Sequence, residues 1–223
     1  MDIQTFINNY YEAFSLKAEL PIAFWYSDSL LGELKQTQGC LFKALPAIRQ
    51  GEIISMNGDS VGCGGGKFYT GFTPMPEHVP NFLSLKERYK QTPEMVVEGI
   101  KGMNVQRSSL PYLHFARIDR LTSFEKVEGL LFLATPDILS GLITWTFFDN
   151  NNPDAVSTPF GSGCSSTITL TVNENRQGGH RTFLGFFDPS VRPYVESNLL
   201  SLTIPMSRFK TMYQTMRNSS LYD

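Results

Sequence analysis

The sequence predicts a mixed α/β or α+β fold, in which helices flank one mixed sheet. Helical and strand-like patterns alternate along the chain, which is typical of a sheet layered with helices rather than a helix bundle or a β-sandwich. Hydrophobic residues make up 41% of the chain and aromatic residues 13%, which is enough for a substantial core. No linker or low-complexity stretch divides the chain, so we expect residues 1–223 to form a single domain.

Helical spacing of apolar residues is clearest in residues 2–15, where one apolar stripe runs along the predicted helix. Thr92 followed by Pro93 is the pattern of a capping residue with a proline in the first helical turn. Pro205 opens a last helix whose methionine and aromatic residues share one face. These patterns predict helices over 2–15, 39–50, 81–90, the segment that begins at Thr92, 136–148 and the segment that begins at Pro205.

Strands are predicted where short apolar, aromatic or alternating runs lie between turn residues. The glycine-rich run 62–66 is predicted as a loop between two of them. Residues 164–174 are ambiguous, because their threonines and branched aliphatic residues favour a strand by propensity alone. The predicted strands are 21–26, 52–56, 67–72, 112–118, 126–134, 182–187 and 199–204.

A short pattern occurs twice in the chain. Gly39-Cys40 is followed by Arg-Gln-Gly at 49–51, and Gly163-Cys164 is followed by Arg-Gln-Gly at 176–178. A predicted strand precedes each copy. Chance is the alternative explanation, because the motif is short and the two spacings differ by three residues.

A duplicated half would make residues 21–62 and 130–192 related units around a pseudo-twofold axis. The threonine-rich segment of the second unit would then form a helix, like 40–50 in the first. The cysteines that begin these two helices would occupy equivalent positions. An arrangement of this kind places a ligand site between two similar halves.

Charge and patterning also exclude some partners. The formal net charge is −2, so the chain lacks the basic excess that binds a phosphate backbone, and we expect no nucleic-acid partner. Residues 129–148 carry a single charge, Asp137, but Thr135-Pro136 in their middle ends a strand and begins a helix. We therefore expect a buried strand–turn–helix and no membrane partner. The first residues lack the basic and apolar regions of a secretory signal, so we expect a cytoplasmic location.

The chain has three cysteines, Cys40, Cys63 and Cys164, which are too few and too far apart for a disulfide framework. We expect all three thiols to be free. They could hold a zinc ion or an iron–sulfur cluster only if the fold brought them together with a fourth ligand. No Cys-x-x-Cys or His-x-x-x-His pair supports such a site, so we assign no metal ligand and no cofactor. A reactive thiol and plain core packing are the other roles open to each cysteine.

Five short motifs follow one another in order: a proline-led strand, a Cys-helix-Gly unit, a Cys-Gly-Gly loop, a Val-Arg pair and an Ile-Pro pair. They stand at 21–23, 40–51, 63–65, 191–192 and 204–205. In this order they resemble the domain of unknown function 169 family of bacteria and archaea, over residues 5–215. The resemblance implies a cytoplasmic single-unit protein and brings no established activity, cofactor or catalytic residue.

The chain departs from that family at one place. Relatives often carry a basic residue before the first cysteine, whereas this chain has Thr37-Gln38-Gly39 there. An anion site that depends on the basic residue would be weakened.

The candidate ligand site combines three features. The glycine-rich run 62–66, followed by Lys67, could point successive backbone N–H groups into one concavity that holds a phosphate or carboxylate. A thiol and two hydroxyls at 164–166 would lie at a helix N-terminus, where N–H donors are unpaired. Arg192, at the end of the second unit, could add a bidentate clamp. The predicted ligand-binding residues are Cys63, Gly64, Gly65, Gly66, Cys164, Ser165, Ser166 and Arg192.

A plainer interpretation of the same residues is that the glycines only permit close packing and that Arg192 pairs with Asp188 at the surface. The function we expect is that of an uncharacterised cytoplasmic protein, binding a small, anionic or apolar-bodied ligand between two similar halves. Two alternatives stay open. One is a cysteine-dependent enzyme, or a metal or redox protein, that uses Cys40, Cys63 and Cys164. The other is an assembly module that forms a homodimer. The sequence names no reaction, so whether the protein is an enzyme stays open.

Overall fold

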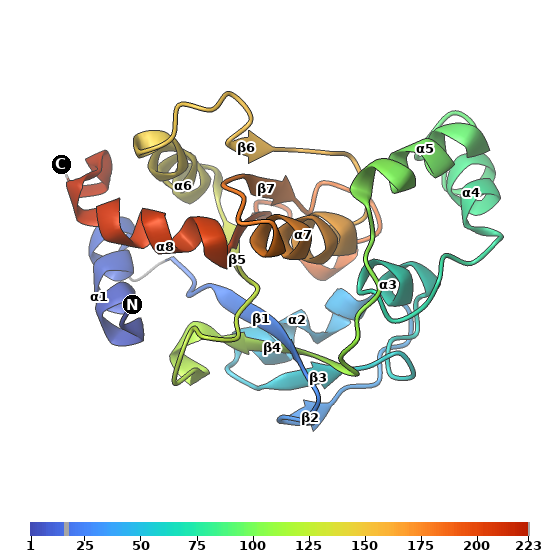
Figure 1. Ribbon diagram of the computed structural model, residues 1–223, viewed down its shortest axis with the longest axis horizontal. Coiled ribbons are helices and arrows are strands. Elements are labelled where there is room, and N and C mark those ends of the chain that lie inside the picture. Colours follow the sequence, from blue (N-terminus) through green and yellow to red (C-terminus); the bar gives the residue numbers. More distant parts are fainter. Residues whose placement is uncertain (16–17, 223) are drawn as a thin grey trace.

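In the computed structural model, residues 1–15 and 18–222 are described, and within them eight strands form one mixed sheet (Figure 1). Their order across the sheet is β2-β3-β4-β1-β5-β8-β7-β6. The predicted mixed α/β fold is therefore confirmed. The strands are β1 Ile22–Ser27, β2 Glu33–Leu34, β3 Ile54–Met56, β4 Tyr112–Arg117, β5 Gly129–Ala134, β6 Val156–Ser157, β7 Thr182–Gly185 and β8 Leu200–Pro205.

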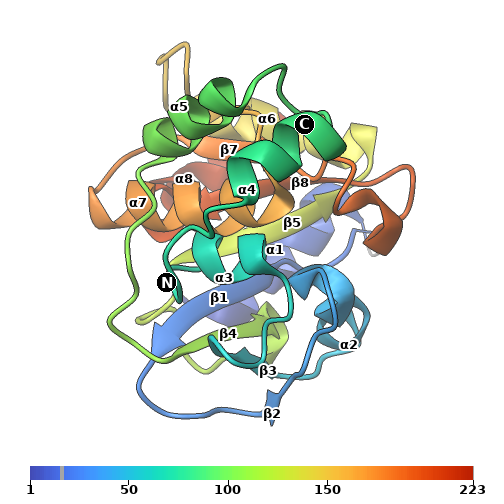
Figure 2. The same cartoon turned by 90° about the vertical axis from the view of Figure 1, so that its right-hand side faces the viewer.

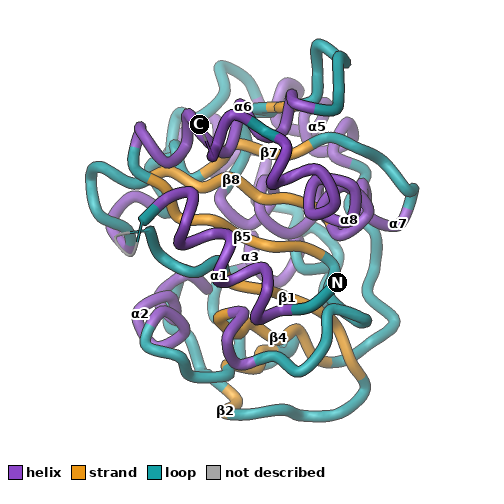
Figure 3. The backbone as a smooth tube through the Cα atoms, turned by 90° about the vertical axis from the view of Figure 1, so that its left-hand side faces the viewer, coloured by secondary structure: helices purple, strands orange, loops and turns teal. Residues whose placement is uncertain are grey.

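Helices cover both faces of this sheet. On one face lie α1, α6 and α8 (Figure 3), and on the other lie α2, α3, α5 and α7 (Figure 2). The main helices are α1 Ile3–Phe14, α2 Leu45–Arg49, α3 Gly64–Tyr69, α4 Val79–Asn81, α5 Pro93–Met103, α6 Pro136–Phe148, α7 Leu170–Arg176 and α8 Met206–Thr215. Shorter helical segments that extend or join them are η1 Leu41–Ala44, η2 Phe82–Lys86, η3 Ile118–Arg120, η4 Ser165–Thr169, η5 Arg192–Tyr194, η6 Met216–Asn218 and η7 Ser220–Tyr222.

The sheet separates two hydrophobic cores. Because successive side chains of a strand point to opposite faces, Ile22, Phe24 and Tyr26 of β1 enter one core, whereas Ala23 and Trp25 enter the other. β1 is buried along its whole length, as is β5 beside it. The central pair of strands is thus covered on both sides, which explains why their sequences are apolar without alternation.

Both outer parts of the sheet have the same sequence of strand directions. From β1 outwards the pairings with β4, β3 and β2 are antiparallel, antiparallel and parallel. From β5 outwards the pairings with β8, β7 and β6 follow the same series. In each half the chain also runs from a long strand to a short strand, a helix that begins after a cysteine, and another strand, with α6 inserted in the second half. Superposition of 21–62 on 130–192 stays a prediction.

Residues 164–174 form a helix, as the duplicated pattern predicts and against their strand propensity. η4 and α7 run without a break over residues 165–176. They lie very close to the sheet: a Cβ placed on Gly129 would be 2.4 Å from Thr171 Cγ2, and one placed on Gly185 would be 2.4 Å from Ser166 Oγ. Small side chains on the helix and glycines in the strands permit this approach, so tertiary packing overrides local propensity.

The prediction of a loop at 62–66 and a strand at 67–72 is wrong, because α3 occupies residues 64–69 and no strand forms between 67 and 72. Cys63 caps this helix, and its Sγ accepts a hydrogen bond from the Gly66 N–H at 3.4 Å. A Cβ on Gly66 would lie 3.0 Å from Val61 Cγ1. The glycines thus let the first turn of α3 pack tightly on the core, and the aromatic residues after them face that core from a helix.

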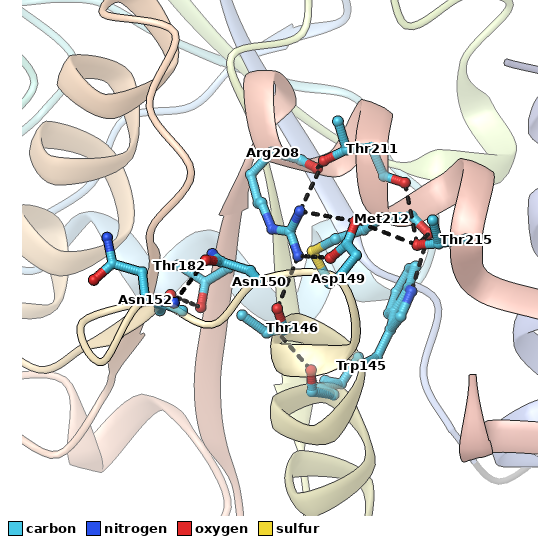
Figure 4. A network of polar contacts seen from close by, with 12 residues as sticks. Trp145, Thr146, Asp149, Asn150, Asn152, Thr182, Arg208, Thr211, Met212 and Thr215 are labelled. Carbon is cyan, nitrogen blue, oxygen red and sulfur yellow. Dashed lines mark hydrogen bonds and ion pairs between the residues drawn. The ribbon is translucent and has the colours of Figure 1, made fainter. Parts of the chain in front are cut away.

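Helices α6 and α8 are joined by a buried polar network (Figure 4). Arg208 of α8, 4% exposed, forms an ion pair with Asp149 and donates to the carbonyl of Thr146 at 2.8 Å. Trp145 Nε1 donates to the carbonyl of Met212 at 3.0 Å. Hydrogen bonds from charged groups are the stronger kind, so this network stabilises the α6–α8 layer.

Residues 129–148 are β5, a turn and α6, as expected from Thr135-Pro136. Across 1–15 and 18–222, we find no helix with the length and apolar character needed to cross a bilayer.

Candidate functional site

A cavity of about 420 Å³ opens on the face of the sheet covered by α3 and α5. Its walls come from α3, from α4 and η2, from α5, and from residues 160–162 of the long connection that follows β6; Ser190 adds a further contact. We call it the α3–α5 cavity. The three helical walls lie together in Figure 2. Its walls therefore combine the segment between β3 and β4 with loops of the second half of the chain.

Three of the predicted site residues line this cavity: Cys63, Gly64 and Gly65. Cys63 is half-buried at the start of α3. Gly66 lies one position further into the helix, where it packs against the core. The structure thus brings the front of the glycine run to a cavity, as a helix rather than as a loop.

The second predicted group, residues 164–166, does not line the cavity. Cys164, Ser165 and Ser166 are buried, and their hydroxyls are used within their own turn: Ser165 Oγ donates to the carbonyl of Ser162 at 2.7 Å, and Ser166 Oγ donates to the carbonyl of Gly163 at 3.2 Å. The preceding Ser162 lines the cavity in their place. A helix that packs its N-terminal side chains on the sheet turns them away from the cavity.

Arg192 does not reach the cavity, and it does not pair with Asp188 either. Its guanidinium donates to four backbone carbonyls of the loops around it, at Phe186, Glu196, Ser197 and Leu199. Carbonyl groups in irregular loops lack the backbone N–H partners that a sheet or helix provides. The five N–H donors of an arginine guanidinium can satisfy several such carbonyls at once. Arg192 therefore holds the chain between β7 and β8.

The three cysteines are electrostatic neighbours. Burial raises the pKa of the Cys40 thiol to about 11, with smaller contributions from Cys63 and Asp188. Burial also raises the pKa of Cys164 well above its ordinary value, with Cys40, Cys63 and Asp188 adding to the effect. Both side chains are therefore neutral thiols at physiological pH. All three cysteines are free.

Asp188 lies within this group, almost fully buried at 1% exposed. Burial raises the pKa of its carboxyl, against hydrogen bonds from Ser190 and the Gly163 backbone. Its Oδ1 accepts from the Ser190 N–H at 3.1 Å, whereas Oδ2 has no partner among the described residues. Within 1–15 and 18–222, no three His, Cys, Asp or Glu side chains are arranged to hold a metal ion.

Sequence reasoning missed the opposite wall of the cavity. Val96, Gly99, Ile100 and Met103 of α5 line it, together with Phe160 from the long connection. Nothing lies within 4 Å of a Cβ placed on Gly99, so this glycine leaves open space at the wall. A glycine that lowers helix propensity in the middle of an apolar helix face is the signal that could have identified it.

The polar groups of the lining are few. Burial raises the pKa of Tyr89 to about 12 and that of Tyr69 further, so both phenols are neutral. Glu87 and Lys90 supply one charge of each sign. This balance favours the apolar-bodied ligand over the anionic one among the two classes that the sequence leaves open.

Comparison with known proteins gives one family match. The model of domain of unknown function 169, described as uncharacterised ArCR, matches residues 14–215. No curated protein and no solved structure matches the chain significantly.

Proposed function

The chain belongs to the DUF169 family of uncharacterised proteins, and we propose that it binds a small, largely apolar molecule in the α3–α5 cavity. The cavity itself carries the proposal. Its volume of about 420 Å³ falls within the range of small-molecule sites, roughly 300–1,000 Å³. Most of its lining is aliphatic, aromatic or glycine, with a few polar groups that could orient a ligand.

The walls of the cavity come from segments that are far apart in the sequence, and none of the lining residues belongs to the first predicted unit, 21–62. One wall is α3, η2 and α5, which lie between β3 and β4, and the other includes Phe160 and Ser162 from the connection after β6. A ligand held by segments so far apart in the sequence would stabilise the whole fold by mass action. We place this activity in the cytoplasm.

Cys63 favours a second candidate function, covalent thiol chemistry. Of the three clustered cysteines, it is the one that lines the cavity. Cys63 is half-buried, as Cys40 is, whereas Cys164 is buried. A thiol at the edge of an apolar chamber could attach an electrophilic ligand, which would make the protein an enzyme or a covalent carrier.

Fluorescence titration with N-phenyl-1-naphthylamine, a neutral apolar probe, tests the first proposal. Gly99→Leu fills the cavity from α5 and should weaken probe binding by about tenfold or more, the equivalent of roughly 1.4 kcal/mol. Gly102→Leu is the matched control: it lies on the same helix with the same open space, but it does not line the α3–α5 cavity. Absence of probe binding by the unmodified protein, or equal binding by both variants, would contradict the proposal.

Alkylation of the folded protein tests the second candidate. A bulky apolar maleimide should label Cys63 faster than Cys40 or Cys164, and prior occupancy of the cavity by the naphthylamine should slow the labelling. Labelling of Cys63 at the same rate with and without the probe would show that a ligand in the cavity does not cover the thiol, and would contradict the second candidate function.

A further inference from the structure

A second cavity, of about 430 Å³, lies on the other side of α5, between that helix and α7. We call it the α5–α7 cavity. Unlike the α3–α5 cavity, its lining is about as polar as it is apolar. Its polar groups come mainly from α7 and from Gln177 and Arg181, which follow that helix. The two helices α5 and α7 can be located in Figure 1.

The two cavities share their dividing wall. Gly99, Met103 and Phe160 line both of them. Met103 has a flexible side chain, and Phe160 is 38% exposed on a connecting segment. The two linings therefore meet at the Met103 and Phe160 side chains and at the open Gly99 position, and a ligand that occupies both cavities would pass these residues.

The groups in the second cavity are suited to a hydrogen-bonding head without charge. Arg181 donates through Nε and Nη2 to Glu174 Oε2, at 3.0 and 2.6 Å, so the two charges neutralise each other. Within the described residues, Arg181 Nη1 has no hydrogen-bond partner. The Gln177 amide likewise makes no side-chain hydrogen bond there and is exposed. Asn173 donates through Nδ2 to the carbonyls of Met103 and Asn104, which leaves its Oδ1 as an acceptor.

We propose that the two cavities together bind one amphiphile, with its apolar body in the α3–α5 cavity and an uncharged polar head, such as a hydroxyl or amide group, in the α5–α7 cavity. This inference rests on the proposed function and adds the class of ligand. The apolar chamber supplies most of the binding free energy, because it removes apolar surface from water. The polar chamber supplies specificity, because the head can hydrogen-bond to the Asn173 and Gln177 amides and a ligand without the head cannot.

Residues Gly99 and Gly102 make the inference testable on one helix. Nothing lies within 4 Å of a Cβ at either position, so leucine can be placed at both without a clash at the Cβ. Gly99 lines both cavities, whereas Gly102 lines only the α5–α7 cavity. A leucine at Gly102 therefore obstructs the head site alone.

The experiment measures displacement of N-phenyl-1-naphthylamine by 1-monododecanoyl glycerol, below the concentration at which this neutral amphiphile forms micelles. Unmodified protein should bind both compounds. Gly102→Leu should retain the naphthylamine and bind the amphiphile about tenfold more weakly, as expected for the loss of one or two hydrogen bonds. Gln177→Ala should act in the same direction without placing a larger side chain in the cavity.

Equal affinity of the unmodified protein, Gly102→Leu and Gln177→Ala for the amphiphile, with naphthylamine binding intact, would overturn the two-chamber inference alone. If the unmodified protein does not bind the naphthylamine at all, the proposed function itself is overturned. Circular dichroism and a thermal melt of each variant separate a binding defect from a folding defect.

Discussion

Arg208 Nη2 donates to the carbonyl oxygen of Thr146 at 2.8 Å, which links the interior of α8 to the last turn of α6. The same guanidinium pairs with Asp149, whose side chain is 20% exposed, while that of Arg208 is 4% exposed. Removal of a buried charge from such a network leaves its partners without compensation.

Arg208→Met should therefore destabilise the protein by about 3 kcal/mol, because it leaves Asp149 and the Thr146 carbonyl unpaired at similar side-chain volume. The measurement is the free energy of unfolding in urea. Arg217→Met is the matched control, since the Arg217–Glu12 pair is more than half exposed on both sides and water replaces it. Equal stability of the two variants would show that the α6–α8 network is not a main source of stability.

His114 should make the protein lose stability in mild acid. Its Nε2 lies 2.7 Å from Ser27 Oγ and its Nδ1 lies 2.7 Å from Ser55 Oγ, and burial lowers its pKa to about 4. The unfolded chain, with an ordinary histidine pKa near 6.5, binds the proton first. The contribution is thus fully present above pH 6.5 and is lost as the pH falls towards 4, by roughly 3 kcal/mol.

The slope of unfolding free energy against pH, compared for the unmodified protein and His114→Gln, measures this contribution. The variant should have the shallower slope between pH 6.5 and 4.5, whatever its absolute stability. Parallel slopes would mean that His114 takes up a proton equally well in the folded protein.

The three cysteines should react differently. Thiol titration of the unfolded, unreduced protein should find all three free, because no disulfide joins them. In the folded protein, Cys63 should react with a small maleimide much faster than Cys40 and Cys164. Burial raises the pKa of those two thiols, so they stay in the unreactive neutral form. Cys63→Ser should abolish the fast phase, whereas Cys40→Ser should keep it. A single free thiol in the unfolded protein would contradict the expected reducing compartment.

Gly129 and Gly99 should respond in opposite directions to alanine. A Cβ on Gly129 would meet Thr171 Cγ2 at 2.4 Å and Phe24 Cζ at 3.0 Å, so Gly129→Ala should destabilise the protein by about 1–3 kcal/mol. Gly99→Ala has open space and should stabilise α5 by up to about 1 kcal/mol through helix propensity. Thermal melts of both variants check this pair, and a neutral Gly129→Ala would show that α7 can move away from the sheet.

The duplicated pattern predicts a geometric relationship that an experimental structure can measure. Residues 21–62 should superpose on 130–192 after a rotation near 180°, with Cys40 on Cys164 and α6 as an insertion. The shared order of strand directions on either side of the β1–β5 pair supports this prediction. A rotation far from 180°, or a superposition that does not align the two cysteines, would show that the Arg-Gln-Gly motifs are similar by chance.

Local patterns in the sequence predicted the positions of most helices and strands. The predicted helix 136–148 coincides with α6, and the predicted helix 2–15 differs from α1 by one residue at each end. Apolar runs identified β1, β4 and β5 within a few residues. Helical spacing, capping residues and prolines act over a few neighbours, so a single chain suffices to read them.

Only part of the candidate site could be predicted from such local patterns. Consecutive glycines made the segment beside Cys63 conspicuous in the sequence, and Cys63, Gly64 and Gly65 line the α3–α5 cavity, but their binding of a ligand stays a prediction. Ser165, Ser166 and Arg192 do not line that cavity, and their polar groups bind backbone carbonyls nearby. A hydroxyl or guanidinium can satisfy a neighbouring carbonyl or a ligand equally well, and composition does not distinguish the two.

The sequence by itself determined the fold class, the positions of most helices and strands, and the presence of a glycine-rich segment beside a cysteine. Only the tertiary structure decided that residues 64–69 form a helix and that residues 165–176 are helical despite the strand propensity of their threonines. It also decided that Met103 of α5 and Phe160, from beyond β6, line the same cavity. The physical reason is distance along the chain. A helix or strand depends on residues a few positions apart, whereas a cavity exists only where segments separated by many residues pack together and leave space between them.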